Sequence, residues 1–213
     1  MKKSFLSLCL LLIGAGVFAF DGKIKIAYKQ FGSSTDKYSF TWNLSGSKLC
    51  LQIEMKTKDV NTLTTFIPDI AKKQLISFEK LNNPEKIFFQ IPLADIKSES
   101  GNIKAELTGD KKMISGFECE KLLVTSERQT TEAWVTRAIE EDWKSFAPFF
   151  QSADEIQGLA KLGVKAFPLQ VTSRNEIGVI VSSSEIDAIQ KETPANEVFE
   201  VPASYKLYTA AKN

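Results

Sequence analysis

Polar and apolar residues alternate along most of the chain, and this alternation predicts β-strands. In DKYSFTWNLSG (36–46), every second residue from Tyr38 to Leu44 is large and apolar. The segments GKIKIAYKQ (22–30) and SKLCLQIEMK (47–56) show the same period of two. Strands with one apolar and one polar face usually pair antiparallel. The Ser-Gly-Ser between the last two segments predicts that they form a hairpin.

Further β-rich runs follow as far as residue 202, separated by turn residues such as Pro68, Pro84 and Pro92. Counted together, the runs predict about ten or eleven strands with short connections. No internal repeat, low-complexity linker or block of charge divides the chain, so we expect a single folded domain.

Residues 140–161 have helical spacing instead of strand spacing. Trp143, Phe146 and Phe150 fall on one face of a helix because they are three and four positions apart. Pro148 should kink or end this first helix. The region therefore predicts a helix that is interrupted near its middle.

A second helical piece is predicted to begin at the capping-box pattern SADE (152–155) and to end near Gly163. A long antiparallel sheet must cover its apolar face, and the apolar stripe of this broken helix can provide the cover. We therefore expect a mainly β (α+β) fold. Its centre would be a strongly curved open antiparallel sheet, or half-barrel, with the broken helix covering the concave face.

The N-terminal residues have a different composition from the rest of the chain. Two lysines precede an apolar run at 5–13, and small residues follow it up to Ala19. This is the pattern of a secretory signal peptide. The run is shorter than the roughly 20 residues of a membrane span, and an uncleaved anchor is the alternative. We expect a signal peptide at 1–19, cleavage near Ala19, and a periplasmic or secreted mature protein.

The charge balance argues against a nucleic-acid partner. Of the 27 basic residues, Lys2 and Lys3 lie in the expected signal peptide, so 25 basic residues remain against 26 acidic ones. The lysines are scattered singly along the strands. A chain of this kind has no basic footprint for nucleic acid.

Few residues offer catalytic or cofactor chemistry. The chain has no histidine, which excludes Ser-His-Asp and Cys-His catalysis and removes the commonest metal ligand. No glycine-rich phosphate-binding motif is present. Glu118 and Glu120 share a strand face, but a solvated face with a lysine nearby explains them better than a catalytic pair. The polar strand end at Ser182–Ser184 has no identifiable base. We therefore expect no enzyme activity, no metal and no cofactor.

Aromatic residues are the remaining candidates for a site. Those on the second predicted strand and on the first predicted helix could line a cavity for an apolar ligand, or they could be ordinary core. The candidate ligand-binding residues are Tyr38, Phe40, Trp42, Trp143, Phe146 and Phe150.

Two cysteines remain after the expected signal peptide, Cys50 and Cys119. An oxidising compartment would permit a disulfide between them. However, Cys50 alternates in step with the polar residues of its strand, whereas Cys119 alternates in step with the apolar residues of its own. This places the two cysteines on opposite faces of the sheet and disfavours the bond. A bulge near Glu120–Lys121 would change that geometry, so the disulfide stays an open alternative.

Three motifs resemble a family of exported bacterial domains of unknown function, the DUF4412 type. The chain segments are ISGFECEKLLV (114–124), TEAWVT (131–136) and FEVPASY (199–205). They resemble the family's I-x-G-Y/F-x-C strand, its W-V/T strand and its closing F-x-V-P-x-x-Y element, with Phe117 where Tyr is usual. The family looks similar to the periplasmic lipoprotein carriers (LolA/LolB-like). The resemblance implies a single lipoprotein-carrier-like domain at 20–213, with a capacity for a hydrophobic ligand.

Two functions are consistent with these observations. The first is a non-catalytic envelope module that binds a hydrophobic or lipid-like ligand in a cleft between sheet and helix. The second is an envelope protein-interaction or sensor domain without a small ligand. In either case we expect a monomer.

Overall fold

The computed structural model describes residues 20–31, 37–81, 84–96 and 102–209, and the expected signal peptide lies outside these ranges. The described residues form one 12-stranded sheet. The strands are Gly22–Gln30 (β1), Lys37–Ser45 (β2), Lys48–Lys56 (β3), Asn61–Asp69 (β4), Gln74–Glu79 (β5), Ile87–Pro92 (β6), Lys104–Ile114 (β7), Phe117–Thr125 (β8), Gln129–Thr136 (β9), Phe167–Asn175 (β10), Ile180–Gln190 (β11) and Lys206–Leu207 (β12). The helical elements are Leu93–Asp95 (η1), Ala147–Phe149 (η2), Asp154–Leu162 (α1) and Asn196–Phe199 (η3), of which only α1 is an α-helix.

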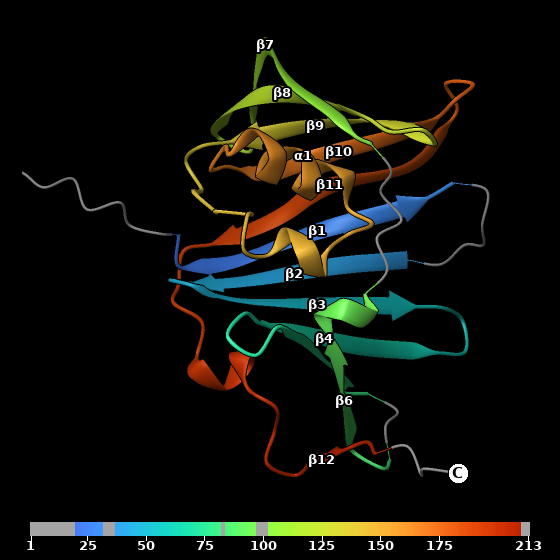
Figure 1. Ribbon diagram of the computed structural model, residues 1–213, viewed down its shortest axis with the longest axis vertical. Helices are drawn as coiled ribbons and strands as arrows, with labels where there is room; N and C mark the ends of the chain where they lie inside the picture. Colours follow the sequence, from blue (N-terminus) through green and yellow to red (C-terminus); the bar gives the residue numbers. More distant parts are fainter. Residues whose placement is uncertain (1–19, 32–36, 82–83, 97–101, 210–213) are drawn as a thin grey trace, which may run out of the picture.

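The sheet is open, curved and almost wholly antiparallel, which confirms the predicted fold class (Figure 1). Its strand order is β12-β6-β5-β4-β3-β2-β1-β11-β10-β9-β8-β7. Strands β1 to β6 form one meander and strands β7 to β11 form a second. The meanders are joined side by side through the pairing of β1 with β11. The two-residue strand β12 pairs parallel to β6 at one edge, and it brings the strand count just above the prediction.

The predicted hairpin is confirmed as β2 and β3. Ser45 pairs with Lys48 across a tight turn in which Gly46 has a φ of +58°, a conformation that glycine adopts without steric cost. The register places Trp42 opposite Leu51. The apolar residues of both strands therefore meet on the concave face.

The prediction for residues 140–161 is half wrong. The first piece is not an α-helix: a turn beginning at Trp143 leads into η2, whose Phe149 N–H donates to the Phe146 carbonyl (2.8 Å). Pro148 lacks the N–H that a continuing α-helical ladder would need. The second piece is the helix α1, but its N-cap is Ala153, without a side-chain cap hydrogen bond, rather than the predicted capping box.

The end of α1 was predicted correctly. Gly163 is left-handed, with a φ of 66°, and its N–H donates to the Ala160 carbonyl (3.2 Å). The next N–H, of Val164, donates to the Leu159 carbonyl (3.1 Å). This pattern ends a helix at a glycine. It turns the chain back toward the start of β10.

The main core lies between the concave face and the η2–α1 segment (Figure 1). The helix approaches β8 closely at Gly158, where a Cβ atom would lie 2.6 Å from Cγ2 of Val124. Trp143, Ile156 and Leu159 are almost wholly buried beneath the segment. Within the described residues, no helix is long and apolar enough to cross a membrane.

A second, smaller core lies on the opposite side of β3 to β6. It contains Cys50, Ile67, Phe78 and Phe199. Phe199 belongs to the chain after β11, which runs through η3 to β12 and is coloured red in Figure 1. We call residues 196–205 the strap. Part of the predicted FEVPASY motif therefore has a structural role, because it covers the back of the sheet.

Tyr205 fastens the far end of the strap. Its hydroxyl donates to the backbone carbonyl of Glu79 (2.9 Å). Its ring meets the ring of Phe78 edge-on, with centroids 5.2 Å apart. Near the other end, the Lys48 ammonium donates to Oδ1 of Asn196 (3.2 Å).

The irregularity expected near Glu120–Lys121 lies on the neighbouring strand. Strand β8 keeps a continuous register with β9, whereas its register with β7 shifts between Leu107 and Lys111. The extra residues are thus accommodated in β7, which is an edge strand.

Candidate ligand-binding groove

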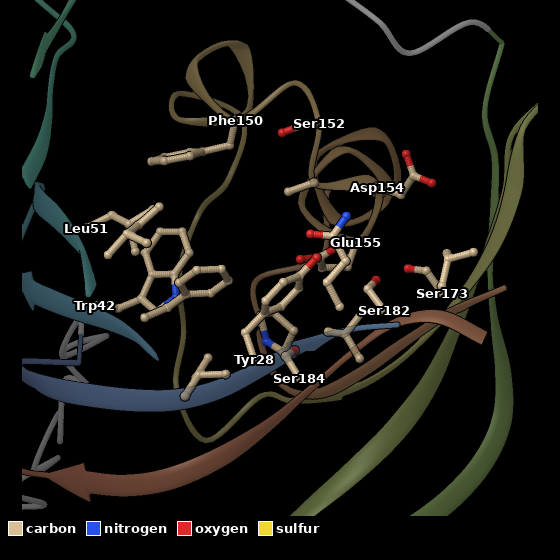
Figure 2. A pocket seen from close by; sticks show the side chains of 18 of the residues that line it. Tyr28, Trp42, Leu51, Phe150, Ser152, Asp154, Glu155, Ser173, Ser182 and Ser184 are labelled. Atoms are coloured by element: carbon tan, nitrogen blue, oxygen red, sulfur yellow. The ribbon is translucent and has the colours of Figure 1, made fainter. Parts of the chain in front are cut away.

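A groove with a volume of about 420 Å³ lies between the concave face of the sheet and the η2–α1 segment (Figure 2). Strands β1, β2, β3, β10 and β11 provide one side, and the start of α1 provides the other. The lining residues are Ile26, Tyr28, Gln30, Phe40, Trp42, Leu51, Ile53, Gln129, Phe150, Ser152, Ala153, Asp154, Glu155, Pro168, Val171, Ser173, Val181, Ser182 and Ser184.

One wall of the groove is apolar. It is formed by Phe40 and Trp42 of β2, Leu51 and Ile53 of β3, and the ring of Phe150. The Trp42 and Phe150 rings meet edge-on, with centroids 5.3 Å apart. This wall is where an apolar chain would be removed from water.

Trp143 supports the apolar wall from below. Its ring is 1% exposed and meets Trp42 edge-on at a centroid distance of 5.6 Å. Its indole N–H donates to the carbonyl of Ala166 (2.7 Å). A buried indole is stable in this position because its one donor has a partner.

The segment that roofs the groove is held by one side chain of α1. The amide Nε2 of Gln157 donates to the carbonyls of Ala147 (2.7 Å) and Phe150 (3.1 Å). These carbonyls belong to η2 and the residue after it, which lack an α-helical ladder of their own. Gln157 therefore ties η2 to α1 and fixes the position of the Phe150 ring.

The opposite end of the groove is polar. Asp154 is 7% exposed, and its Oδ2 accepts hydrogen bonds from Nε2 of Gln129 (2.9 Å) and Oγ1 of Thr131 (3.3 Å). The Thr131 hydroxyl also lies 3.0 Å from Oγ of Ser173. These contacts join the N-terminal turn of α1 to β9 and β10. They fix the polar end of the groove in place.

Glu155 is the ionisable group that faces the groove without such a network. The pKa of its carboxyl is raised to about 7, mainly by burial and also by the neighbouring charge of Asp154, while a backbone N–H opposes both. Glu155 lines the groove together with Tyr28, Ser182 and Ser184 (Figure 2). Its charge therefore depends on pH near neutrality.

The six predicted site residues are divided among four places. Phe40, Trp42 and Phe150 line the groove. Trp143 lies beneath it, and Tyr38 lies outside the lining, with its ring edge-on to Tyr28 at 6.0 Å.

Phe146 lines a separate depression of about 250 Å³ that also contains Glu141. Glu141 is 7% exposed. The pKa of its carboxyl is raised to about 7, mainly by burial and also by the charge of Asp142, while a backbone N–H opposes both.

Sequence reasoning missed most of the polar end. Ser182 and Ser184 were identified only as a polar strand end, and Asp154 and Glu155 only as part of a capping pattern. The sequence feature that could have indicated this end is that Ser182 and Ser184 are two positions apart on β11 and therefore lie on the same, inward face of the strand. That signal becomes useful only once β11 is known to pair with β1.

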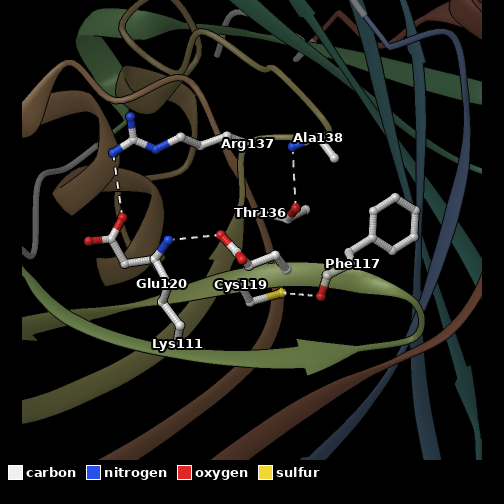
Figure 3. A network of polar contacts seen from close by, with 8 residues as sticks. Lys111, Phe117, Cys119, Glu120, Thr136, Arg137 and Ala138 are labelled. Carbon is white, nitrogen blue, oxygen red and sulfur yellow. Dashed lines mark hydrogen bonds and ion pairs between the residues drawn. The ribbon is translucent and has the colours of Figure 1, made fainter.

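The charged residues of β7 and β8 form ion pairs rather than a site (Figure 3). Lys111 Nζ lies 2.9 Å from Oε1 of Glu118, and Arg137 lies 3.5 Å from Glu120. Glu118 and Glu120, which were considered as a catalytic pair in the sequence, thus each form an ion pair with a different cation. Pairs as exposed as Lys111–Glu118 contribute little stability. Among the described residues, no group of three or more acidic or cysteine side chains is placed to hold a metal.

The candidate disulfide is absent from the structure. Cys50 and Cys119 are both free and both buried. Cys119 belongs to the main core and its Sγ contacts the carbonyl of Phe117 (3.6 Å), whereas Cys50 belongs to the core under the strap. The alternation of residues along the two strands explains this separation, because it directs the two thiols into different cores.

Residues 20–205 match the model of a family described as "Domain of unknown function (DUF4412)". The match covers the three motifs from which the resemblance was drawn and confirms it. No curated protein sequence matches the chain.

Several solved structures are similar to the chain in fold. An uncharacterized conserved protein from Thermus thermophilus has a TM-score of 0.53 and 9% identity, over 90% of this chain and 92% of that one. PNGF-II has a TM-score of 0.49 and 14% identity, over 89% of this chain but only 31% of its own. A LolA superfamily protein from Nitrosomonas europaea has a TM-score of 0.33 and 10% identity, over 86% of this chain and 92% of its own. At these identities the likeness concerns the fold alone.

Proposed function

The chain belongs to the DUF4412 family, a family of unknown function, and from the groove we propose that it is an exported binding protein for an amphipathic or lipid-like ligand. The apolar chain of the ligand would lie along the wall of β2 and β3 under Phe150. Its polar end would lie near the start of α1.

The observation that carries the proposal is the division of the groove into an apolar wall and a polar end. Its volume of about 420 Å³ falls in the range of small-molecule sites, roughly 300–1,000 Å³. Such sites are mostly apolar and contain a few polar groups that orient the ligand. The wall and the polar end have this arrangement.

We also propose that the protein is not an enzyme. Among the described residues, no groove serine makes a hydrogen bond to a carboxylate that could act as its general base: Ser173 lies against Thr131, which itself donates to Asp154. A threonine hydroxyl is too weak a base for that role. The groove therefore supports binding rather than turnover.

Lipid extraction and native mass spectrometry of the purified full-length protein test the proposal directly. We expect acyl-containing molecules to co-purify, and an apolar fluorescent probe such as N-phenyl-1-naphthylamine to bind to the emptied protein. Protein that is repeatedly empty and does not bind the probe would contradict the proposal.

A matched pair of variants locates the binding. Ser184 lines the groove, and Ser183 points to the other side of β11 because successive strand residues alternate. Ser184→Phe should fill the groove and lower probe affinity at least about tenfold. Ser183→Phe should leave the affinity unchanged, and equal effects from the two variants would place the probe elsewhere.

The alternative of a protein partner has less support. The outer edge of β7 is the natural place for an added strand, because β7 ends the sheet order. However, this edge has a register shift and carries Lys111 and Lys112, features that discourage strand addition. A single stoichiometric partner recovered from envelope extracts would favour the alternative.

A further inference from the structure

The polar end of the groove is acidic. Of the 19 lining residues in the part of the chain that the structure describes, Asp154 and Glu155 are carboxylic acids and none is lysine or arginine. Sites for carboxylate or phosphate headgroups rely on arginine or lysine donors. An anionic headgroup would therefore meet the like charge of these side chains, opposed only by the backbone N–H groups at the start of α1.

From this composition we propose that the groove selects a single-chain amphiphile with a cationic headgroup, an alkyl amine or an alkyl quaternary ammonium. The inference rests on the proposed function, since it assumes that the groove holds an apolar chain. It adds the charge of the headgroup, which the apolar wall by itself does not determine.

The two carboxylates have different roles. Asp154 is committed to Gln129 and Thr131 and holds the start of α1 against the sheet. Glu155 faces the groove, and the charge that acts on it is the negative one of Asp154. Tyr28 of β1 and Ser182 and Ser184 of β11, which line the same groove, offer it no cationic group. A ligand cation would supply the positive charge that Glu155 lacks.

Aromatic rings border the same space. The Tyr28 and Phe40 rings are stacked with centroids 4.9 Å apart, and both line the groove. The faces of aromatic rings attract ammonium and quaternary ammonium groups. A cation between these rings and Glu155 would thus have partners of two kinds.

Three probes with the same tail test the inference: dodecyltrimethylammonium, dodecanoate and dodecyl glucoside, titrated calorimetrically below their micelle concentrations. We expect the cationic probe to bind at least about tenfold more tightly than the neutral one. Dodecanoate should bind most weakly of the three.

Charge variants separate the carboxylate from the groove as a whole. Glu155→Gln should reduce the affinity for the cationic probe to that for the neutral probe. Glu155→Lys should reverse the preference toward dodecanoate. Glu176→Gln, an exposed change at the turn between β10 and β11, should alter neither.

The outcomes distinguish the two proposals. Binding of none of the three probes contradicts the proposed function itself. Equal binding of all three, or tightest binding of dodecanoate, leaves the groove as an apolar site and overturns the headgroup inference. Retained cation preference in Glu155→Gln also overturns it.

The inference also gives a pH dependence with a definite sign. A cation binds the ionised carboxylate, and the pKa of Glu155 in the empty groove is about 7. Affinity for the cationic probe should therefore rise as the pH increases from 6 to 8, while affinity for the neutral probe stays constant. A cation affinity that falls over this range would contradict the role given to Glu155.

Discussion

The two faces of β3 are covered in different ways, and the cover in front borders a groove. In front, Leu51 and Ile53 meet the η2–α1 segment and border the groove. Behind, Cys50 is wholly buried under the strap. The strap is the short 3-10 helix η3 followed by irregular chain, and its Phe199 packs into the core behind β3. The helix α1, roughly 10 Å wide, touches a curved surface only along a line. The groove therefore results from the shape of the helical cover rather than from missing side chains.

The largest effect on stability should come from removing a large side chain from the smaller core behind β3 to β6. Phe78 is 1% exposed and packs against Tyr205 of the strap. Phe78→Ala should lower the free energy of unfolding by about 3–5 kcal/mol, because it removes a buried ring and leaves a cavity. Denaturant unfolding measures this loss.

The same variant tests whether the faces are independent. Probe binding in the groove should be unchanged at temperatures where the Phe78→Ala protein is folded. Loss of binding in the folded variant would show that the strap and the groove are coupled through the sheet.

The second prediction concerns the front cover and depends on pH. The pKa of Glu141 is raised to about 7 mainly by burial, so the folded protein holds this proton more tightly than the unfolded chain does. Stability should therefore fall as the pH rises from about 4.5 to 7. Glu141→Gln should raise the free energy of unfolding at pH 8 by up to about 3 kcal/mol, and by little at pH 4.

Glu140→Gln is the matched control for that prediction, because Glu140 is the exposed neighbour of Glu141. Its unfolding free energy should follow that of the unmodified protein at both pH values. Equal stabilisation by the two variants would mean that net charge, and not burial, is the cause.

A smaller effect is expected where α1 meets the sheet. Alanine is a better helix former than glycine by about 1 kcal/mol, but the Cβ of Gly158→Ala would lie 2.6 Å from Cγ2 of Val124. Overpacking of this kind costs roughly 1–3 kcal/mol, so we expect a net loss of about 1 kcal/mol. Thermal unfolding checks this.

A second substitution shows whether the contact is the cause. Adding Val124→Ala to Gly158→Ala should remove the clash, so that the double variant is more stable than the sum of the two single effects. Additive losses would contradict the close contact between α1 and β8.

The smallest effect compares the two thiols. Burial raises the pKa of Cys50 to about 12, and burial also raises the pKa of Cys119, opposed by the nearby charge of Lys112. Neither thiol should react quickly with an alkylating reagent in the folded protein, and Cys50 should be the slower. In denaturant without reductant both should react; an unreactive pair there would indicate the disulfide that the structure lacks.

Alternation in the sequence was a good guide to the faces of single strands. Phe40 and Trp42 were predicted to share a face, and both line the groove. Cys50 was predicted to lie on the other face of the sheet from Cys119, and the two thiols enter different cores. A period of two determines the side of a residue directly, so these predictions needed no knowledge of the strand order.

The failures arose where the answer depended on distant parts of the chain. Helical spacing at Trp143 and Phe146 could not distinguish an α-helix from a turn with a 3-10 helix, since both bring residues three apart together. Ser184 lies beside Tyr28 only because β11 pairs with β1. No local pattern states which strands become neighbours, so the polar end of the groove could not be predicted.

The order of the strands also bears on how quickly the groove can form. Each meander consists of strands that follow one another in the chain, so each can assemble from local contacts. The pairing of β1 with β11 instead joins the first strand of one meander to the last strand of the other, and contacts of such high sequence separation slow folding. The groove takes Phe40 from one meander and Ser184 from the other. We therefore expect ligand binding to appear only in the last kinetic phase of refolding, after the secondary structure is complete.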